Sequence, residues 1–370
     1  MSPLYVPILK AKKGEFSALR SLPATVASKI LPVLDVPMPG EKSTDTFEEA
    51  ITKTAYAMGK AWSGRPAFVD MSKWKPNART GGRVHVLEYA VSAIVDQGVL
   101  PYAVVAYDRW DDMEYSQALR SIGATFGSKF CLRLNAEALE DMRDPDFFQE
   151  RLEAIVDGLG IVPEDSVAIV DFGDVGHRSV PDLLDRADVA IEQLQDSGFG
   201  SIVIAGGSMP EFVNEAVRKP NEAGMVHRVE MLLWKAIFAD RRSDSIVFGD
   251  YGIRNPNAMD GIISTHNNGK IRYTIDNQFF ILRGQSKQLT RLGLQQKALS
   301  ALLVNSPHFM GERFSWGDST IVTCSDPNSK YMGGPTEWIG IDTNHHIHAV
   351  LAEIFEHQRR VTGRTVPGGR

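Results

Sequence analysis

The feature that most limits the fold of this chain is a series of eight short apolar runs, spaced at fairly even intervals over its first two thirds. Each run is almost continuously aliphatic or β-branched, as expected of parallel strands buried on both faces. The runs are Tyr5–Leu9, Leu31–Val36, Ala67–Met71, Tyr102–Tyr107, Phe130–Leu134, Val167–Phe172, Ser201–Ala205 and Ser245–Phe248.

Segments with helical periodicity separate these runs, among them Thr44–Trp62, Arg83–Gln97 and Pro181–Gln195. Strand and helix in alternation require right-handed crossovers and a parallel sheet. Eight such units are the number that closes a TIM-type (β/α)8 barrel, so we predict this α/β fold. An open doubly wound sheet is the alternative, but the loop after the first run reads KAKKGEF and lacks a glycine-rich fingerprint.

The regular pattern ends after Phe248, and the remaining chain predicts an enlarged C-terminal region. We expect residues 1–253 to hold the eight barrel strands. We expect residues 254–370 to add a hairpin insertion, closing helices and lid-like loops to the same domain. The predicted elements are a hairpin over 261–284 with its turn at Asn267-Asn268-Gly269 and a second strand Ile271–Leu282, a helix Ser286–Val304, a loop Asn305–Ile341 and a closing helix His346–Glu356.

The composition is that of an ordinary globular protein, with 43% hydrophobic and 23% charged residues and a net charge of −6. No stretch is apolar enough to cross a bilayer, so we expect no membrane partner. The first residues lack the apolar core of a signal peptide, and the two cysteines, Cys131 and Cys324, form no disulfide framework. These features predict a cytoplasmic protein.

Polar side chains follow every predicted strand, which is where active sites of this barrel lie. Arg109 and Asp108, in AYDRW, belong to this ring. Carboxylates at a barrel mouth can act as acids or bases or bind Mg²⁺ through oxygen, but they can also pair with cations in a purely structural role. No spaced His/Cys set indicates a transition metal. The candidate catalytic residues are Lys10, Asp35, Asp70, Asp171 and Asp250, and the candidate ligand-binding residues Arg133, Asn135 and Tyr251.

The turn IAGGSMP after the seventh run is a candidate phosphate-binding loop. Gly206 and Gly207 permit close backbone approach, and Ser208 can cap a helix whose N-terminus binds an anion. An ordinary helix cap after a tight turn is an equally good interpretation.

Aromatic and basic residues in the C-terminal region suit a base or nucleotide. Tyr273 and Arg283 lie on the predicted hairpin, where they could fold over the mouth, and the segment FSWGDS resembles a ligand-closing loop. Equally, these aromatics could only anchor the region to the barrel. His345 and His346 are adjacent, so their side chains diverge, and we expect a surface or capping role for one of them.

The ordered motifs YVPILKAKKGEF, LPVLDVP, GGSMP, FGDYGI, IRYT, ILRG, FSWGD and NHHI resemble the "beta protein" or beta family protein of phages and bacteria. The resemblance extends from about Tyr5 to about Ala352. It implies a role in phage–host conflict such as antiviral defence. It implies no reaction and assigns no site residues.

Two hypotheses follow. The first is an enzyme acting on a phosphorylated or nucleotide-like ligand at the barrel mouth, with Mg²⁺ as a candidate cofactor. The second is a non-catalytic binding or scaffold module that recognises a component of a defence complex. Unpaired Asp35, Asp70 and Asp250 in an open pocket would favour the enzyme, whereas charges paired across the mouth would favour the binding module.

Overall fold

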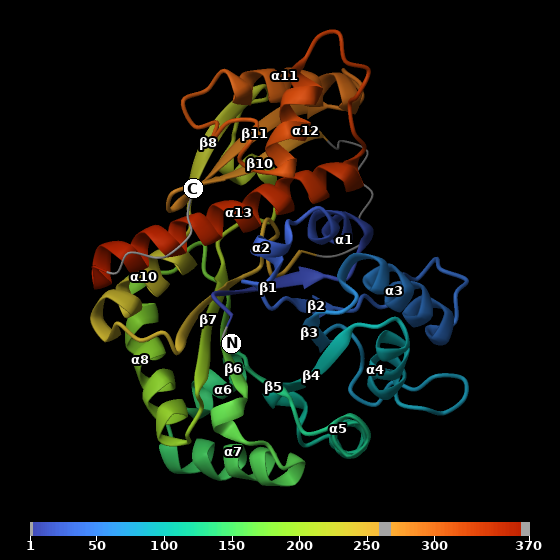
Figure 1. Cartoon of the computed structure of the whole chain (residues 1–370), viewed down its shortest axis with the longest axis vertical. Helices are drawn as coiled ribbons and strands as arrows, with labels where there is room; N and C mark the ends of the chain where they lie inside the picture. The colour runs from blue at the N-terminus through green and yellow to red at the C-terminus, as the bar shows by residue number, and fades with distance from the viewer. Residues whose placement is uncertain (1–2, 259–267, 364–370) are drawn as a thin grey trace.

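The computed structural model describes residues 3–258 and 268–363, and its centre is a closed barrel of eight parallel strands (Figure 1). All eight predicted runs contribute a strand, and the predicted (β/α)8 fold is confirmed. Around the barrel the order is β1 (Tyr5–Lys10), β2 (Val33–Asp35), β3 (Pro66–Asp70), β4 (Leu100–Ala106), β5 (Cys131–Leu134), β6 (Val167–Asp174), β7 (Ser201–Gly207) and β9 (Ile246–Asp250).

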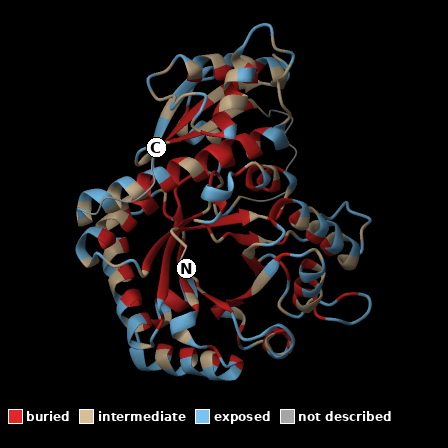
Figure 2. Ribbon diagram, viewed as in Figure 1, coloured by how far each residue is buried: buried red, intermediate tan, exposed pale blue. Residues whose placement is uncertain are grey.

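Burial on both faces explains why these strands read as continuous apolar runs. In β1, Val6 and Ile8 pack inside the barrel, while Tyr5 and Leu9 pack against the helices outside. Figure 2 shows the strands almost entirely buried and the outer faces of the surrounding helices exposed. The fold therefore removes apolar surface from water on both sides of one sheet.

Helices cover the outside of the barrel, and several of them begin at a residue whose side chain caps them. Thr46 forms a capping box with Glu49, and Ser179 caps a later helix. The covering helices are α1 (Lys13–Arg20), α2 (Ala24–Ala27), α3 (Phe47–Trp62), α4 (Val86–Asp96), α5 (Met113–Phe126), α6 (Ala136–Asp141), α7 (Pro145–Leu159), α8 (Val180–Asp196), α10 (Val229–Arg241) and α13 (Pro335–Thr362), with short 3₁₀ turns at Tyr107–Arg109 and Pro163–Asp165.

Two insertions build a second layer on the far side of α13 from the barrel (Figure 1). The first lies between β7 and α10 and contains α9 (Val213–Ala216) and β8 (Glu222–His227). The second lies between β9 and α13 and contains β10 (Asn268–Ile275), β11 (Gln278–Ser286), α11 (Leu292–Val304) and α12 (Trp316–Ser325). Strand β11 pairs with both β10 and β8 in one antiparallel sheet, which packs on its own apolar core.

The predicted C-terminal elements need correction. The hairpin turn lies at Asp276-Asn277, between Ile275 and Gln278, so the prediction of one strand over Ile271–Leu282 was wrong. Asn277 has a φ of 56°, a left-handed conformation that asparagine tolerates better than most residues. The predicted partner strand, Ile262–Thr265, lies outside the described residues.

The helices of this region also differ from their predicted bounds. The helix expected from Ser286 begins at Leu292, and the closing helix runs from Pro335 to Thr362, well beyond His346–Glu356. The expected loop Asn305–Ile341 contains α12 and the first turns of α13. No helix among the described residues is long and apolar enough to cross a membrane.

Candidate functional site

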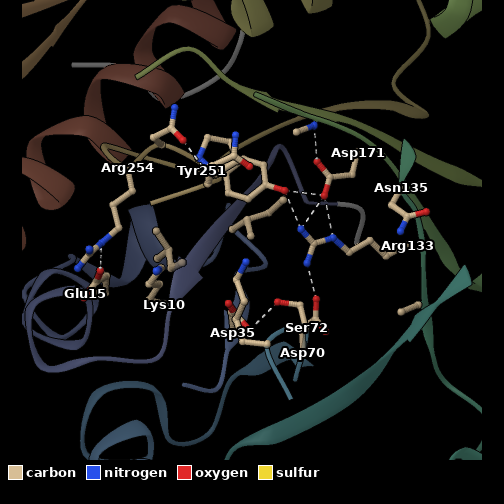
Figure 3. Close-up of a pocket in the computed structure, with 18 of the residues that line it drawn as sticks. Lys10, Glu15, Asp35, Asp70, Ser72, Arg133, Asn135, Asp171, Tyr251 and Arg254 are labelled. Atoms are coloured by element: carbon tan, nitrogen blue, oxygen red, sulfur yellow. Dashed lines mark hydrogen bonds and ion pairs between the residues drawn. The ribbon is translucent and has the colours of Figure 1, made fainter. Parts of the chain in front are cut away.

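A cavity of about 380 Å³ lies at the carboxyl ends of the barrel strands (Figure 3). Residues from six strands, β1 to β6, and from the segment after β9 line it. Seven of the twelve candidate residues line this cavity: Lys10, Asp35, Asp70, Arg133, Asn135, Asp171 and Tyr251. The structure thus brings these seven residues together at one mouth, whereas Gly206, Gly207, Ser208, Asp250 and Arg283 do not line it.

Arg133, near the end of β5, holds one half of the cavity wall together. Its guanidinium donates to Asp70 and, through Nε and Nη2, to Asp171 at 2.9 and 2.6 Å. Nη2 also lies 2.7 Å from the hydroxyl oxygen of Tyr251, which in turn donates to Asp171 at 2.6 Å. Burial raises the pKa of Tyr251 well above its usual value, so the phenol keeps the proton it donates. Figure 3 shows Arg133 between Asp171 and Asp70.

Asp35 lies beside this cluster but is held differently. The strand register places it next to Lys10 on β1 and Asp70 on β3. Its Oδ1 accepts a hydrogen bond from the hydroxyl of Ser72 at 3.1 Å. Burial, and then the negative charge of Asp70, raise the pKa of Asp35 to about 6. A carboxyl group with this pKa can both accept and release a proton near neutral pH.

Several cavity residues were not singled out from the sequence because they do not end strands. Glu15, in the first turns of α1, accepts from Arg254 Nε at 2.7 Å. Asn255 donates to Asp174 and to the carbonyl of Met209, both at 2.8 Å. The only sequence signal for Arg254 and Asn255 is their place in FGDYGIRNP, directly after the eighth barrel strand.

Further cations complete the lining. Arg109 binds the carbonyl oxygens of Met71 and Ser72. Lys73 lies on the exposed part of the lining, and Lys10 Nζ donates to the carbonyl of Ala258 at 3.0 Å.

Asp250 does not line the cavity, although it ends β9 as Asp70 ends β3. It is buried beneath the mouth, where it accepts from Tyr5 at 2.6 Å and lies 2.9 Å from His346 Nε2. Burial alone would raise its pKa, but the contacts with His346 hold the pKa of Asp250 below its usual value. The carboxylate joins β9 and β1 to α13.

Arg228 extends this buried group of charges to the insertion. Its Nη1 donates to Glu353 of α13 at 2.5 Å, and its Nη2 lies 3.6 Å from Asp250. Burial raises the pKa of the neighbouring Glu230 to about 7. These charges connect α10, α13 and β9 inside the protein.

His345 and His346 are both fully buried within α13, so the expected surface or capping role is wrong for either of them. Their side chains do diverge, as predicted. His345 Nδ1 lies 2.9 Å from Asp318 and its ring stacks on Tyr273 at 3.7 Å between centroids. Tyr273 itself is buried and donates to Asp318 at 2.6 Å. In this region the aromatic residues anchor the second layer to α13.

The GGSMP turn is also packed by protein. A side chain at Gly206 would meet Val175 at 3.2 Å, and one at Gly207 would meet Pro256 at 3.0 Å. Ser208 accepts from the backbone N–H of Val229 at 2.9 Å and thereby caps the N-terminus of α10. Ser208 therefore caps a helix, as in the ordinary cap interpretation. The capped helix, α10, does not follow the turn directly but comes after the insertion that contains α9 and β8.

Arg283 lies on β11 in the second layer and does not line the cavity. Its Nη1 donates to the carbonyls of Val217 and Arg218 at 2.7 and 2.6 Å. Within residues 3–258 and 268–363, no three His, Cys, Asp or Glu side chains gather closely enough to hold a metal ion.

Fold and cavity together define a (β/α)8-barrel protein with a charged cavity at the carboxyl ends of its strands. The chain belongs to the Beta protein family, which matches residues 5–352 and confirms the resemblance in the ordered motifs. No curated protein matches the chain.

Proposed function

We propose that this protein is an enzyme that performs acid–base chemistry on a small phosphorylated or nucleotide-like ligand in the cavity at the barrel mouth. The observation that carries the proposal is Asp35, a carboxyl group in the cavity wall whose pKa of about 6 suits proton transfer near neutral pH. Asp35 is the proposed acid or base, and Arg133 positions the adjacent carboxylates Asp70 and Asp171.

The other lining residues support an anionic ligand. Three cations reach the same cavity from different places: Lys10 from the end of β1, Lys73 from the segment after β3, and Arg109 from the 3₁₀ turn after β4. Arginine and lysine are the usual partners of phosphate oxygens. A volume of about 380 Å³ falls at the lower end of ordinary small-molecule sites. Mg²⁺ is the proposed cofactor to test first; phosphate oxygens of the ligand would have to supply part of its coordination, since no three described acidic side chains gather to hold it.

Thermal denaturation with added ligands tests this proposal. The probes are inorganic phosphate and ADP, each with and without Mg²⁺. We expect ADP to raise the melting temperature, since a ligand at about 100 times its Kd stabilises by about 2.7 kcal/mol. Arg109→Ala should remove the shift, whereas the remote exposed Asp157→Asn should keep it. The same shift in Arg109→Ala, or none in the wild type at millimolar ligand, would contradict the proposal.

A binding or scaffold module in a phage–host conflict complex is the second candidate. Two observations favour it. Arg133 is already paired with Asp70 and Asp171 across the mouth. On the second layer, Leu289 and Leu294 are exposed leucines, at 75% and 48%. A stoichiometric protein partner that Leu294→Asp releases, without any ligand shift at the mouth, would select this candidate.

Both candidates place the protein in the cytoplasm, where its two free cysteines would stay reduced.

A further inference from the structure

A second cavity, of about 640 Å³, adjoins the mouth on the outside of the barrel. It is a groove between α1 and α3, and Thr336 and Ile339 of α13 close one side of it. Glu15 and Arg254 line both this groove and the mouth cavity. A ligand longer than the mouth could therefore continue past these two side chains into the groove.

The groove concentrates positive charge on a chain whose net charge is −6. Among the described residues that line it, Glu15 is the one acidic side chain, and it already binds Arg254. Lys53 of the lining forms an ion pair with Asp45 at 2.7 Å. A basic stripe on an otherwise acidic protein attracts polyanions locally. The basic lining residues are Lys12, Lys13, Arg20, Lys53, Lys60 and Arg254.

An aromatic side chain lies among these cations. Tyr56 of α3 is 55% exposed, and the Lys60 ammonium lies 5.2 Å from its ring centroid. Lys53, Tyr56 and Lys60 share one face of α3. These three residues alone could be an ordinary solvent-exposed helix face. Lys13 and Arg20 of α1 also line the groove, however, so the cations come from two helices. Cations that follow a phosphate backbone, combined with an aromatic ring for base stacking, are the features by which proteins hold single strands.

We propose that this groove binds the sugar–phosphate backbone of a single-stranded nucleic acid whose end enters the mouth cavity. The inference deepens the proposed function, because it makes the mouth's substrate class the terminal nucleotide of a strand. Only the role of the terminal nucleotide as substrate rests on the proposed function. Binding of a strand in the groove does not depend on the chemistry at the mouth. Inorganic polyphosphate would satisfy the cations but would make no use of Tyr56.

Fluorescence anisotropy with a labelled single strand of about 20 nucleotides, longer than the roughly 4–16 nucleotides of typical sites, tests the groove. The test variant carries Lys13→Glu, Arg20→Glu and Lys60→Glu. The control variant carries Lys129→Glu, Lys219→Glu and Lys287→Glu, which change the net charge equally at exposed sites away from the groove. We expect the test variant to bind at least about tenfold more weakly and to lose about two from the salt slope, since each phosphate contact contributes roughly 0.7.

Equal weakening in both triple variants would indicate only diffuse charge attraction and would overturn the proposal, as would absence of binding by the wild type. The milder Lys60→Gln keeps the test valid if the triple variant misfolds. Tyr56→Ala should weaken binding of the strand but not of inorganic polyphosphate. An equal effect on both polymers, or on neither, would overturn the assignment to nucleic acid.

Measuring both ligands on the wild type separates the two proposals. Strand binding by the wild type, together with no thermal shift from ADP, would mean that the proposed function fails and the groove stands. The reverse result would mean that the groove proposal fails and the mouth stands.

Discussion

Three carboxylates of the cavity wall differ in how the protein compensates their charge. Asp70 and Asp171 both accept from the guanidinium of Arg133, whereas Asp35 accepts from the neutral hydroxyl of Ser72. A hydroxyl stabilises a carboxylate less than a guanidinium does, so burial and the nearby charge of Asp70 dominate at Asp35. The chain thus keeps one destabilised carboxylate in its mouth, a feature common to sites of proton transfer.

This arrangement predicts how stability changes with pH. The pKa of Asp35 is raised to about 6 in the folded protein, so the folded chain holds this proton more tightly than the unfolded chain. Asp35 therefore costs stability progressively as the pH rises from about 4 to about 6, and the full cost persists above about pH 7. Asp35→Asn removes the titrating group, and we expect it to stabilise the protein by about 1–3 kcal/mol at pH 8 and much less at pH 4.

Urea denaturation of the variant and the wild type across this pH range measures the difference. Asp157→Asn, on the exposed surface of α7, is the matched control, and its difference from the wild type should stay flat. A difference for Asp35→Asn that is also flat, or that grows toward low pH, would contradict the assigned direction of the pKa.

Which polar residues reach the mouth could be predicted only in part from the sequence. The position of a residue at a strand end predicts nearness to the mouth, and this was enough for Asp35 and Asp70. It could not separate Asp250 from Tyr251, because adjacent residues point to opposite sides and only the assembled barrel shows which side is open. Glu15 lies in a helix, so no strand pattern predicts its place in the cavity.

At the scale of the elements, α13 packs against α1 beside the mouth and the groove. The contact is close since both helices present a glycine. A side chain on Gly14 would meet the Thr336 carbonyl oxygen and Ile339 at 2.8 Å, and one on Gly340 would meet the carbonyl oxygen of Gly14 at 2.9 Å. Backbone atoms cannot move aside as a flexible side chain can, so the two glycines set the spacing of the helices.

Gly14→Ala should therefore destabilise the protein by about 1–3 kcal/mol, the usual cost of overpacking a tight contact. Alanine has a better helix propensity than glycine by about 1 kcal/mol, which would stabilise α1. A net loss of stability would therefore have to come from the tight contact. Gly40→Ala is the control, because its added carbon would meet nothing within 4 Å. Chemical denaturation measures both changes, and a Gly14→Ala protein as stable as the wild type would show that the helices are not held at this spacing.

The elements that sequence reasoning missed have weak or misleading local signals. Strand β8 alternates between exposed and half-buried residues and pairs on one side only, so it lacks the apolar run that marks the barrel strands. The Asn268-Gly269 pair is a strong hairpin signal, yet Asn268 already begins β10. The actual turn at Asp276-Asn277 has no glycine. Tertiary pairing of β11 with both neighbours decided the register here.

At the scale of the whole molecule, one helix belongs to two cores. The first half of α13 contributes Trp338 and Ile341 to the core of the second layer. Its second half contributes Val350 and Ile354 to the core of the barrel. A helix that must be intact for both cores to form couples their stabilities, because helix formation is itself cooperative. We infer that the layers unfold together.

Ile321→Ala tests this coupling from the side farther from the mouth. Ile321 of α12 is fully buried in the second core, so the truncation should cost about 2–5 kcal/mol. Native-state hydrogen exchange should then show the same loss of protection in barrel strands β5 and β6 as in β10 and β11. The exposed Leu289→Ala should change neither by more than about 0.5 kcal/mol. Lost protection confined to β10 and β11 would mean that the second layer opens independently. The barrel and α13 would then form the mouth and the groove without support from the second layer.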